Sequence, residues 1–474
     1  MLNNTKQQSI YILYSIIVII ILRFILTGLI PLLDKTESRY AEIARLMYET
    51  QEWVVLQIDY GVPFWAKPPL STWMSATSYS VFGVNEIAAR LPYFLVCLLL
   101  VFILGKFVKK AGKSFYLPAF ILLTTPEFLL HAGVVSTDAV LCFSITLIMI
   151  SFWKSIENNK RNFWNYLFFI ALGLGLLSKG PLVLVLTAPP LFIWLIIQKV
   201  SIKDIWNKIP WLTGILITIA IALPWYLMAE NRSPGFLDYF IVGEHFKRFL
   251  VSGWKGDLYG SGHKQPFGMI WVFVFVFSFP WIQFIFIKLW KERRTILKNK
   301  WVSFLVLWLL WTPLFFTISK NILHTYTLPI TIPLALLMVH YWHEFKNKKL
   351  LIMLGSVFPL LVLIATAYIS FVNPKIIKDL NTDKYVIDKL MKTEPNTPRF
   401  YWGKKTYSSQ FYANGHIKVI NEASIDSIHN LNDTIIVLIK PKRIKYIPEV
   451  YRQKMVAIDS SAKTLIYKLK KQLP

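Results

Sequence analysis

The apolar stretch IYILYSIIVIIILRFILTGLIPLL at residues 10–33, followed by the charged segment DKTESRY at 34–40, decides the class of this protein. The first part is apolar apart from Arg23, and a membrane-spanning helix needs roughly 20 such residues. The run is longer than the apolar core of a secretory signal peptide and lacks a clear small-x-small cleavage site. We therefore expect a retained first transmembrane helix that ends in a charged segment at the membrane boundary.

The composition of the whole chain agrees with many more spans. Of 474 residues, 55% are hydrophobic and only 16% are charged, which is too little charge to cover a soluble fold of this size. The net charge of +26 would suggest nucleic acid in a soluble protein. Here the basic residues lie mostly in short loops between apolar runs, so we expect a membrane and no nucleic acid as partner. The two cysteines lie inside apolar runs and predict no disulfide framework.

The apolar runs predict about 11 to 13 transmembrane helices. Every second loop between them is short and basic, and the positive-inside rule makes these loops cytoplasmic. The N-terminus is then cytoplasmic, and the long loop 33–83 faces outward from the inner (plasma) membrane of the cell. The runs that we interpret as spans are 10–32, 84–105, 115–131, 135–153, 163–178, 181–198, 211–229, 267–288, 301–318, 326–342 and 350–372.

The chain changes character near residue 374, and we expect a transmembrane domain over 1–373 and a small extracytoplasmic α/β domain over 374–474. Helices are predicted at 382–393 and 443–453. Short runs rich in Ile, Val and Tyr predict strands at 398–402, 417–420, 434–440, 455–459 and 464–469.

The first outward loop, 33–83, is unusually long and polar for this chain. Apolar residues repeat at helical spacing over 37–50 and again over 69–82, which predicts two amphipathic helices in the membrane interface. Asp34, Glu37 and Arg39 precede the first of them. A single acid there is explained equally well as a helix cap. Several charges at a membrane boundary are costly, so they tend to be paired or functional.

The other outward loops add further charged groups to the same face of the membrane. Lys and Arg neutralise phosphate oxygens as a leaving group forms, and a carboxylate removes a proton from an acceptor. This chemistry suits a lipid that carries a phosphate and a sugar. A lysine at a span end also has the simpler explanation of reaching to the lipid headgroups. Together with Lys67 of the first outward loop, the groups in question are Asp138, Lys179, Glu244, His245, Lys247, Arg248, Lys320 and His324.

Seven motifs in a fixed order carry a resemblance to a known family. Each motif is weak alone, but together they resemble the polyprenyl-phosphate-sugar transferases of the GT-C superfamily over about residues 30 to 335. Similar members are the bacterial lipid A aminoarabinosyltransferases and the protein-mannosyltransferase-like proteins. The motifs are TESRYAEIARLM at 36–47, FWAKPP at 64–69, STD at 136–138, LSKGP at 177–181, LPWY at 223–226, EHFKRF at 244–249 and SKNILHTYTLP at 319–329.

The resemblance implies an all-α polytopic membrane bundle with outer-face amphipathic helices and an active site that opens outward. It implies inverting transfer of a sugar from a polyprenyl (undecaprenyl) phosphate donor to a lipid, protein or glycan acceptor. The catalytic positions that it assigns are Asp34, Glu37 and Asp138. The substrate-binding positions are Arg39, Tyr40, Lys67, Lys179, His245, Arg248, Lys320 and Tyr326.

The chain departs from the family pattern at two acidic positions. The pattern Asp-Glu-x-Arg-Tyr reads Thr36-Glu37-Ser38-Arg39-Tyr40 here, and an aspartate occurs two positions earlier, as Asp34. Relatives with a bound metal have Glu before the lysine of the first loop, where this chain has Ala66. We therefore assign no metal ligand and expect no required cofactor. A divalent metal held by Glu244 and His245 is the alternative.

Two other classes of function stay open at this point. A lipid-linked-sugar flippase or other transporter would present a similar charged face, but would be expected to hold charges at membrane depth, where Arg23 stands almost alone. A non-catalytic membrane scaffold would instead act through the C-terminal domain.

Overall fold

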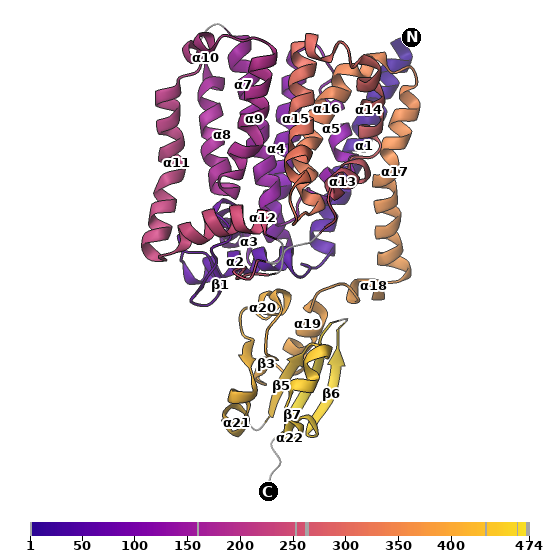
Figure 1. The fold of residues 1–474 in the computed structure, drawn as a ribbon. Coiled ribbons are helices and arrows are strands. Elements are labelled where there is room, and N and C mark those ends of the chain that lie inside the picture. Colours follow the sequence, from indigo (N-terminus) through magenta and orange to yellow (C-terminus); the bar gives the residue numbers. More distant parts are fainter. Residues whose placement is uncertain are drawn as a thin grey trace.

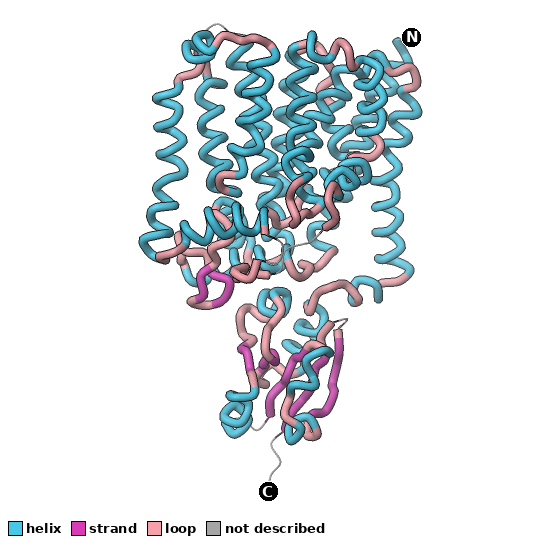
Figure 2. Tube along the Cα trace, viewed as in Figure 1, coloured by secondary structure: helices cyan, strands magenta, loops and turns pink. Residues whose placement is uncertain are grey.

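The computed structural model describes residues 2–158, 161–251, 254–260, 265–431, 434–461 and 463–470. A bundle of helices forms most of the molecule, and a smaller part containing a sheet lies at one end of it (Figures 1 and 2). The start of the chain and α10 lie at the other end of the bundle (Figure 1). The expected architecture of a helical bundle followed by strands is therefore present.

Within the described residues, six helices are long and apolar enough to cross a membrane, and a bent helix pair is a possible seventh span. The exposed surfaces of these helices carry many large apolar side chains, as lipid contact requires. The six are α1 (Leu2–Leu29), α4 (Glu86–Lys110), α7 (Thr137–Glu157), α11 (Trp211–Arg232), α15 (Lys300–Thr317) and α17 (Lys348–Ala367).

This number is lower than the 11 to 13 spans that we predicted, because several apolar runs are short or broken helices. The run 115–131 breaks where Pro126 begins a new helix, and 267–288 bends by 107° at a break that contains Pro280. The shorter elements are α5 (Leu117–Leu123), α6 (Pro126–His131), α8 (Phe163–Lys179), α9 (Leu182–Ile197), α10 (Ile202–Lys208), α12 (Arg248–Leu250), α13 (Met269–Phe277), α14 (Trp281–Glu292), α16 (Thr331–Tyr341), the π-helices η1 (Asp238–Lys247) and η5 (Tyr368–Val372), and the 3₁₀ helices η2 (Ile296–Lys298), η3 (His324–Ile330) and η4 (Trp342–Glu344).

The first outward loop contains the two helices that were predicted, α2 (Thr36–Thr50) and α3 (Leu70–Phe82). A small hairpin of β1 (Gln57–Asp59) and β2 (Val62–Pro63) lies between them. Side chains on several sides of α2 are fully buried, which an interfacial helix with one face in lipid would not show. The helix α2 is therefore packed between the bundle and the C-terminal part, and this packing fixes its position more firmly than a lipid interface would.

The C-terminal part is built on a five-stranded sheet in the order β4-β3-β5-β7-β6. The strand β3 pairs in parallel with β4 and β5, and β7 pairs antiparallel with β5 and β6. The central strand β5 is buried on both faces, between two apolar clusters. The strands are β3 (Arg399–Trp402), β4 (Lys418–Ile420), β5 (Thr434–Ile439), β6 (Met455–Ser460) and β7 (Leu465–Lys470), and the helices are α18 (Lys375–Lys378), α19 (Lys384–Thr393), α20 (Tyr407–Tyr412), α21 (Glu422–Leu431), η6 (Pro441–Tyr446) and α22 (Glu449–Arg452).

The orientation of the bundle is a prediction that paired cysteine variants test. Lys346 lies in a predicted cytoplasmic loop and Lys454 in the C-terminal part; both are exposed, while the native Cys97 and Cys142 are buried and give little background. In right-side-out vesicles, Lys454→Cys should react with a membrane-impermeant maleimide. Lys346→Cys should react only after detergent is added. The reverse pattern would contradict the positive-inside assignment.

Candidate functional site

A cavity of about 420 Å³ lies at the end of the bundle next to the sheet, between α2, η1, η3 and the start of α9. Eight of the eleven predicted site residues line it, although they come from six separate motifs. Charged residues from several outward loops therefore lie together around one cavity. These eight residues are Arg39, Tyr40, Lys67, Asp138, Lys179, His245, Arg248 and Tyr326.

The pair of Asp138 and Lys179 forms one wall of the cavity. Asp138 stands in the first turn of α7, where Ser136 caps the helix and accepts a hydrogen bond from the Asp138 backbone N–H at 3.0 Å. Lys179 ends α8, and its Nζ lies 2.5 Å from Asp138 Oδ1 and 5.0 Å from the centre of the Tyr326 ring. Both charged side chains are largely buried, so each depends on the other for its stability.

The turn after Lys179 requires a glycine. Gly180 has φ of +67°, and a Cβ atom there would lie 2.5 Å from the ring of Phe240. Because Gly180 has no side chain, α8 can turn directly into α9 while η1 packs against the turn. The positions of Lys179 and of the η1 side chains in the cavity both depend on this close approach.

Glu244 holds two cations on the opposite wall. One of its oxygens lies 3.1 Å from Lys67 Nζ, and Arg248 donates hydrogen bonds of 2.8 and 2.9 Å to the same carboxylate. Asp257 lies 3.6 Å from the other side of Arg248. Burial alone would raise the pKa of Glu244, but the charges of Lys67 and Arg248 outweigh it and hold that pKa below its usual value. This wall therefore carries a carboxylate that stays ionised.

Arg39 contributes a fourth cation, and one of its N–H groups has no partner in the protein. Its guanidinium donates one bond of 3.1 Å to the Tyr259 carbonyl oxygen, and the Nε–H is buried without a partner. The rings of Tyr40, Phe64 and Tyr407 surround the guanidinium at 5.3, 5.7 and 6.0 Å. A buried unpaired N–H is costly, and this one belongs to a residue that lines the cavity.

His245 has both ring nitrogens close to backbone oxygens, Nδ1 2.7 Å from the Phe240 carbonyl and Nε2 3.2 Å from the Lys179 carbonyl. Burial lowers the pKa of His245, which favours the neutral ring. The Glu244 oxygens already face Lys67 and Arg248, and Ala66 supplies no ligand. The described residues contain no group of three or more metal-ligating side chains in metal-binding geometry, so this donor set does not fit a divalent metal.

Three predicted site residues lie outside the cavity lining. Asp34 accepts hydrogen bonds from Ser408 and from Ser38, and burial raises its pKa although these bonds oppose the shift. Glu37 accepts bonds of 2.8 and 2.6 Å from Arg90. Lys320 is exposed. At the position where the family pattern has its aspartate, Thr36 lines the cavity instead.

The motifs pointed to some lining residues without assigning them a role in substrate binding. Glu244 stands beside His245 in the EHFKRF motif, and the sequence places it among the charged groups of the outward loops and as an alternative metal ligand. Thr36 begins the first motif. Its place in the family pattern, where relatives have an aspartate, is the signal that could have identified it as a lining residue. Tyr259 lies outside every motif, and its position becomes visible only in the fold, where its hydroxyl group donates to Pro63 and accepts from the Trp65 N–H.

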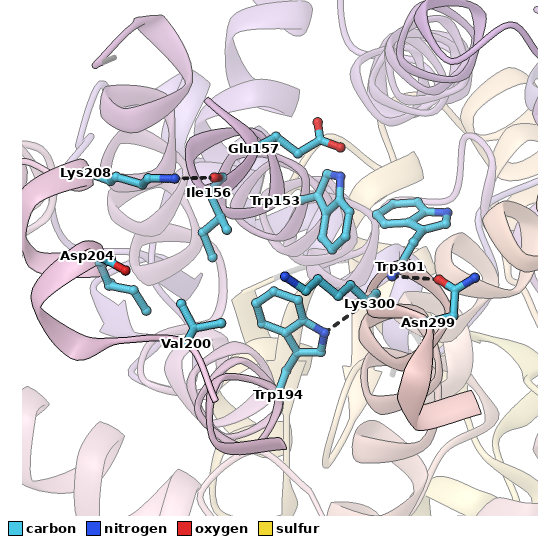
Figure 3. Close-up of a pocket in the computed structure, with 11 residues that line it drawn as sticks. Trp153, Ile156, Glu157, Trp194, Val200, Asp204, Lys208, Asn299, Lys300 and Trp301 are labelled. Atoms are coloured by element: carbon cyan, nitrogen blue, oxygen red, sulfur yellow. Dashed lines mark hydrogen bonds between the residues drawn. The ribbon is translucent and has the colours of Figure 1, made fainter. Parts of the chain in front are cut away.

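A second cavity, of about 510 Å³, lies at the far end of the bundle beside α10. Figure 3 shows Trp153, Trp194 and Trp301 beside the side chain of Lys300. The Trp194 indole donates to the Lys300 carbonyl at 3.0 Å, and Lys208 Nζ donates to a backbone oxygen of α7 at 2.7 Å. None of the predicted site residues lines this second cavity. The candidate site is therefore the cavity next to the sheet.

Known glycosyltransferases are similar to this chain in sequence. Residues 5–240 match the family described as dolichyl-phosphate-mannose-protein mannosyltransferase. An undecaprenyl phosphate-alpha-4-amino-4-deoxy-L-arabinose arabinosyl transferase of Wigglesworthia glossinidia brevipalpis is 30% identical over 75% of this chain and 63% of its own length. A second such transferase, of Pseudomonas fluorescens, is 28% identical over 67% of this chain and 58% of its own length. The chain thus spans about three fifths of the length of these relatives.

Solved structures show the same fold. ArnT from Cupriavidus metallidurans, bound to undecaprenyl phosphate, matches with a TM-score of 0.77 over 97% of this chain and 98% of that chain, at 16% identity. The archaeal oligosaccharyltransferase AglB from Archaeoglobus fulgidus matches with a TM-score of 0.51 over 92% of this chain and 70% of that chain, at 12% identity. The resemblance to the GT-C transferases is confirmed: this multi-pass membrane protein is similar to them in sequence and in fold.

The Glu244 network predicts a pH-dependent stability. Glu244→Gln leaves Lys67 and Arg248 without their carboxylate and should destabilise the fold by about 3–5 kcal/mol at neutral pH. Because the pKa of Glu244 is lowered, wild type keeps this stabilisation above the ordinary value of 4.5 and loses it as the pH falls toward the lowered pKa. The Glu244→Gln variant should not show this loss of stability as the pH falls. Thermal unfolding in detergent across this pH range measures both effects.

The matched control for this measurement is Glu157→Gln. Glu157 pairs with Lys154 at 2.6 Å, but its side chain is 44% exposed. Such surface pairs contribute about 0–1 kcal/mol, so little change is expected. Equal unfolding temperatures for Glu244→Gln and Glu157→Gln would contradict the importance of the buried network.

Proposed function

We propose that this chain is an integral membrane glycosyltransferase. It moves a sugar from a polyprenyl phosphate, such as undecaprenyl phosphate, to a lipid, protein or glycan acceptor at the outer face of the membrane. The observation that carries the proposal is the charge of the cavity: four cationic side chains and two carboxylates line it, with His245 neutral. The cavity therefore has an excess of two positive charges at the level where a lipid phosphate would lie.

The charge excess favours the products of transfer over the donor. A sugar-linked polyprenyl phosphate is a phosphodiester with one negative charge. When the bond between the sugar C1 and the phosphate oxygen breaks, its electron pair stays on that oxygen and the leaving polyprenyl phosphate gains a second charge. Lys67, Arg39 and Arg248 would stabilise this developing charge more strongly than the charge of the donor, which is the condition for catalysis.

The acceptor must lose a proton as it attacks the sugar C1. Among the three predicted catalytic acids, Asp138 is the one that lines the cavity, and we propose it as the general base. Its partner Lys179 would then hold the carboxylate in place and approach the phosphate. Asp34 and Glu37 remain alternative bases, although both are engaged in bonds outside the cavity. Attack opposite the leaving phosphate inverts the configuration at C1.

The arabinosyl transferase relatives suggest aminoarabinose as the sugar and lipid A as one acceptor. The transporter alternative has less support. Arg23, the charge expected at membrane depth, donates bonds of 3.1 and 3.2 Å to the Leu129 and Leu130 carbonyl oxygens. These contacts give it a structural role at the end of α6.

Release of free polyprenyl phosphate from purified protein in lipid tests the proposal, with a panel of polyprenyl-phosphate sugars as donors and a membrane extract as acceptor. Wild type should release it from at least one donor. Lys67→Ala should slow release by about 10²–10³-fold through lost charge stabilisation. Asp138→Asn should slow it by about 10²–10⁴-fold through loss of the base.

Two further variants separate the bases, and one serves as control. If Asp34→Asn or Glu37→Gln, rather than Asp138→Asn, shows the large loss while remaining folded, the base assignment moves to that residue. Lys346→Ala, at the far end of the bundle, should keep wild-type activity. No release by wild type from any donor would contradict the proposed function.

A further inference from the structure

The C-terminal part is bound to the first outward loop by polar contacts around the start of α2. The Ser408 N–H and hydroxyl donate bonds of 3.0 and 2.5 Å to the two Asp34 carboxylate oxygens. The backbone N–H of Asp34 donates to the Asn381 carbonyl at 2.8 Å, and the Asn381 amide donates back to the Asp34 carbonyl at 2.6 Å. Asp34, which the sequence suggested as a base, is therefore the main acceptor of this docking contact.

Two further contacts hold the helix α20 against the same loop. Asp59 of the first loop accepts from Lys405 Nζ at 2.9 Å and from Gln410 Nε2 at 3.1 Å. The Tyr412 hydroxyl, at the end of α20, accepts from the Leu32 N–H at 2.7 Å. These contacts hold both ends of α20 in place relative to α2. The side chains between the two ends are held in place as well.

Tyr407, the first residue of α20, lies beside Arg39, which lines the cavity. Its ring centre lies 6.0 Å from the Arg39 guanidinium carbon, within the range of a cation–π contact. Burial raises the pKa of Tyr407, and the nearby Arg39 charge opposes this shift. Of the three rings around Arg39, those of Tyr40 and Phe64 belong to the first loop, and only Tyr407 comes from the C-terminal part.

We infer that α20 completes the donor site: Tyr407 holds the Arg39 guanidinium in the orientation in which it binds the phosphate of the lipid. Tyr407 acts through Arg39 and is therefore a positioning residue. The inference rests on the proposed function, since it assigns the phosphate of that donor to Arg39. A guanidinium binds phosphate oxygens through N–H groups in a fixed planar geometry, so the strength of these bonds depends on its orientation.

The arrangement also couples phosphate binding at Arg39 to the docking of α20 on the first outward loop. If the phosphate binds Arg39 best when Tyr407 is in place, phosphate binding must in turn stabilise the docked position of α20, because such coupling is reciprocal. Polyprenyl phosphate should then reduce the opening of the contact between Asp34 and Ser408. A C-terminal part that merely covers the bundle would show no such response.

Steady-state kinetics of the full chain in lipid give the first test. Tyr407→Ala should raise KM for the polyprenyl-phosphate sugar by about 2- to 30-fold, the range of a cation–π contact, with a smaller effect on kcat. Tyr407→Phe keeps the ring and should restore KM to near the wild-type value. Tyr446→Ala, at an exposed tyrosine of the C-terminal part, is the matched control and should change neither constant. Wild-type KM in Tyr407→Ala, or an equal change in Tyr446→Ala, would overturn the inference.

Hydrogen exchange gives a second test that does not depend on turnover. Undecaprenyl phosphate added to wild type should slow exchange of the α20 amides, and the slowing should be lost in Tyr407→Ala. If wild type releases polyprenyl phosphate in the activity assay but α20 shows no response at saturating ligand, the inference fails and the proposed function stands. If wild type shows no release and no response, both fail.

Discussion

A buried ion pair between Arg90 and Glu37 joins the parts on which the site depends. Arg90, near the start of α4, donates 2.8 and 2.6 Å bonds to Glu37 in the first turn of α2. Its remaining donors reach carbonyl oxygens at the end of α1, including Thr27 at 2.8 Å and Pro31 at 3.1 Å. These carbonyls have no partner within the helix, and a charged donor satisfies them in a region where water is scarce. The pair therefore sets the start and direction of α2, and thereby the position of Arg39 in the cavity.

The rest of the site is held by charged groups that restrain one another before any ligand arrives. Lys179 is held by Asp138, and Lys67 and Arg248 are both held by Glu244. Groups fixed in this way would need little reorganisation when charge develops on a leaving phosphate, and their field is strong because the paired side chains are largely buried. The ion pairs give up some attraction to a ligand, but they supply the fixed geometry that a mobile lysine lacks.

The sequence predicted which residues meet in the cavity better than it predicted the boundaries of the membrane spans. Ordered motifs placed eight residues in one cavity, and runs rich in Ile, Val and Tyr placed the five strands to within about one residue. The spans were harder, because composition does not reveal where a proline breaks an apolar run, as Pro126 does. Asp34 and Glu37 share a segment with Arg39, but Asp34 lies in the turn before α2 and faces Ser408, and Glu37 lies in the first turn of α2 and faces Arg90. The role of Tyr407 depends on contacts across more than 300 residues, which no local pattern encodes.

The two acids that this chain lacks explain why its cavity has an excess of positive charge. Acids at positions 36 and 66, as in the family pattern, would cancel the two charges by which cations exceed carboxylates. In relatives with a bound metal, the divalent ion would restore these two positive charges. Thr36 and Ala66 remove both the acids and the ligand that such an ion needs, and the cavity keeps the same net charge through side chains alone. In the proposed transfer the leaving phosphate would carry close to two negative charges, so the excess would match the product and exceed the charge of the donor. The absence of the two acids is therefore consistent with the proposed chemistry, because it leaves the charge that the leaving group would require.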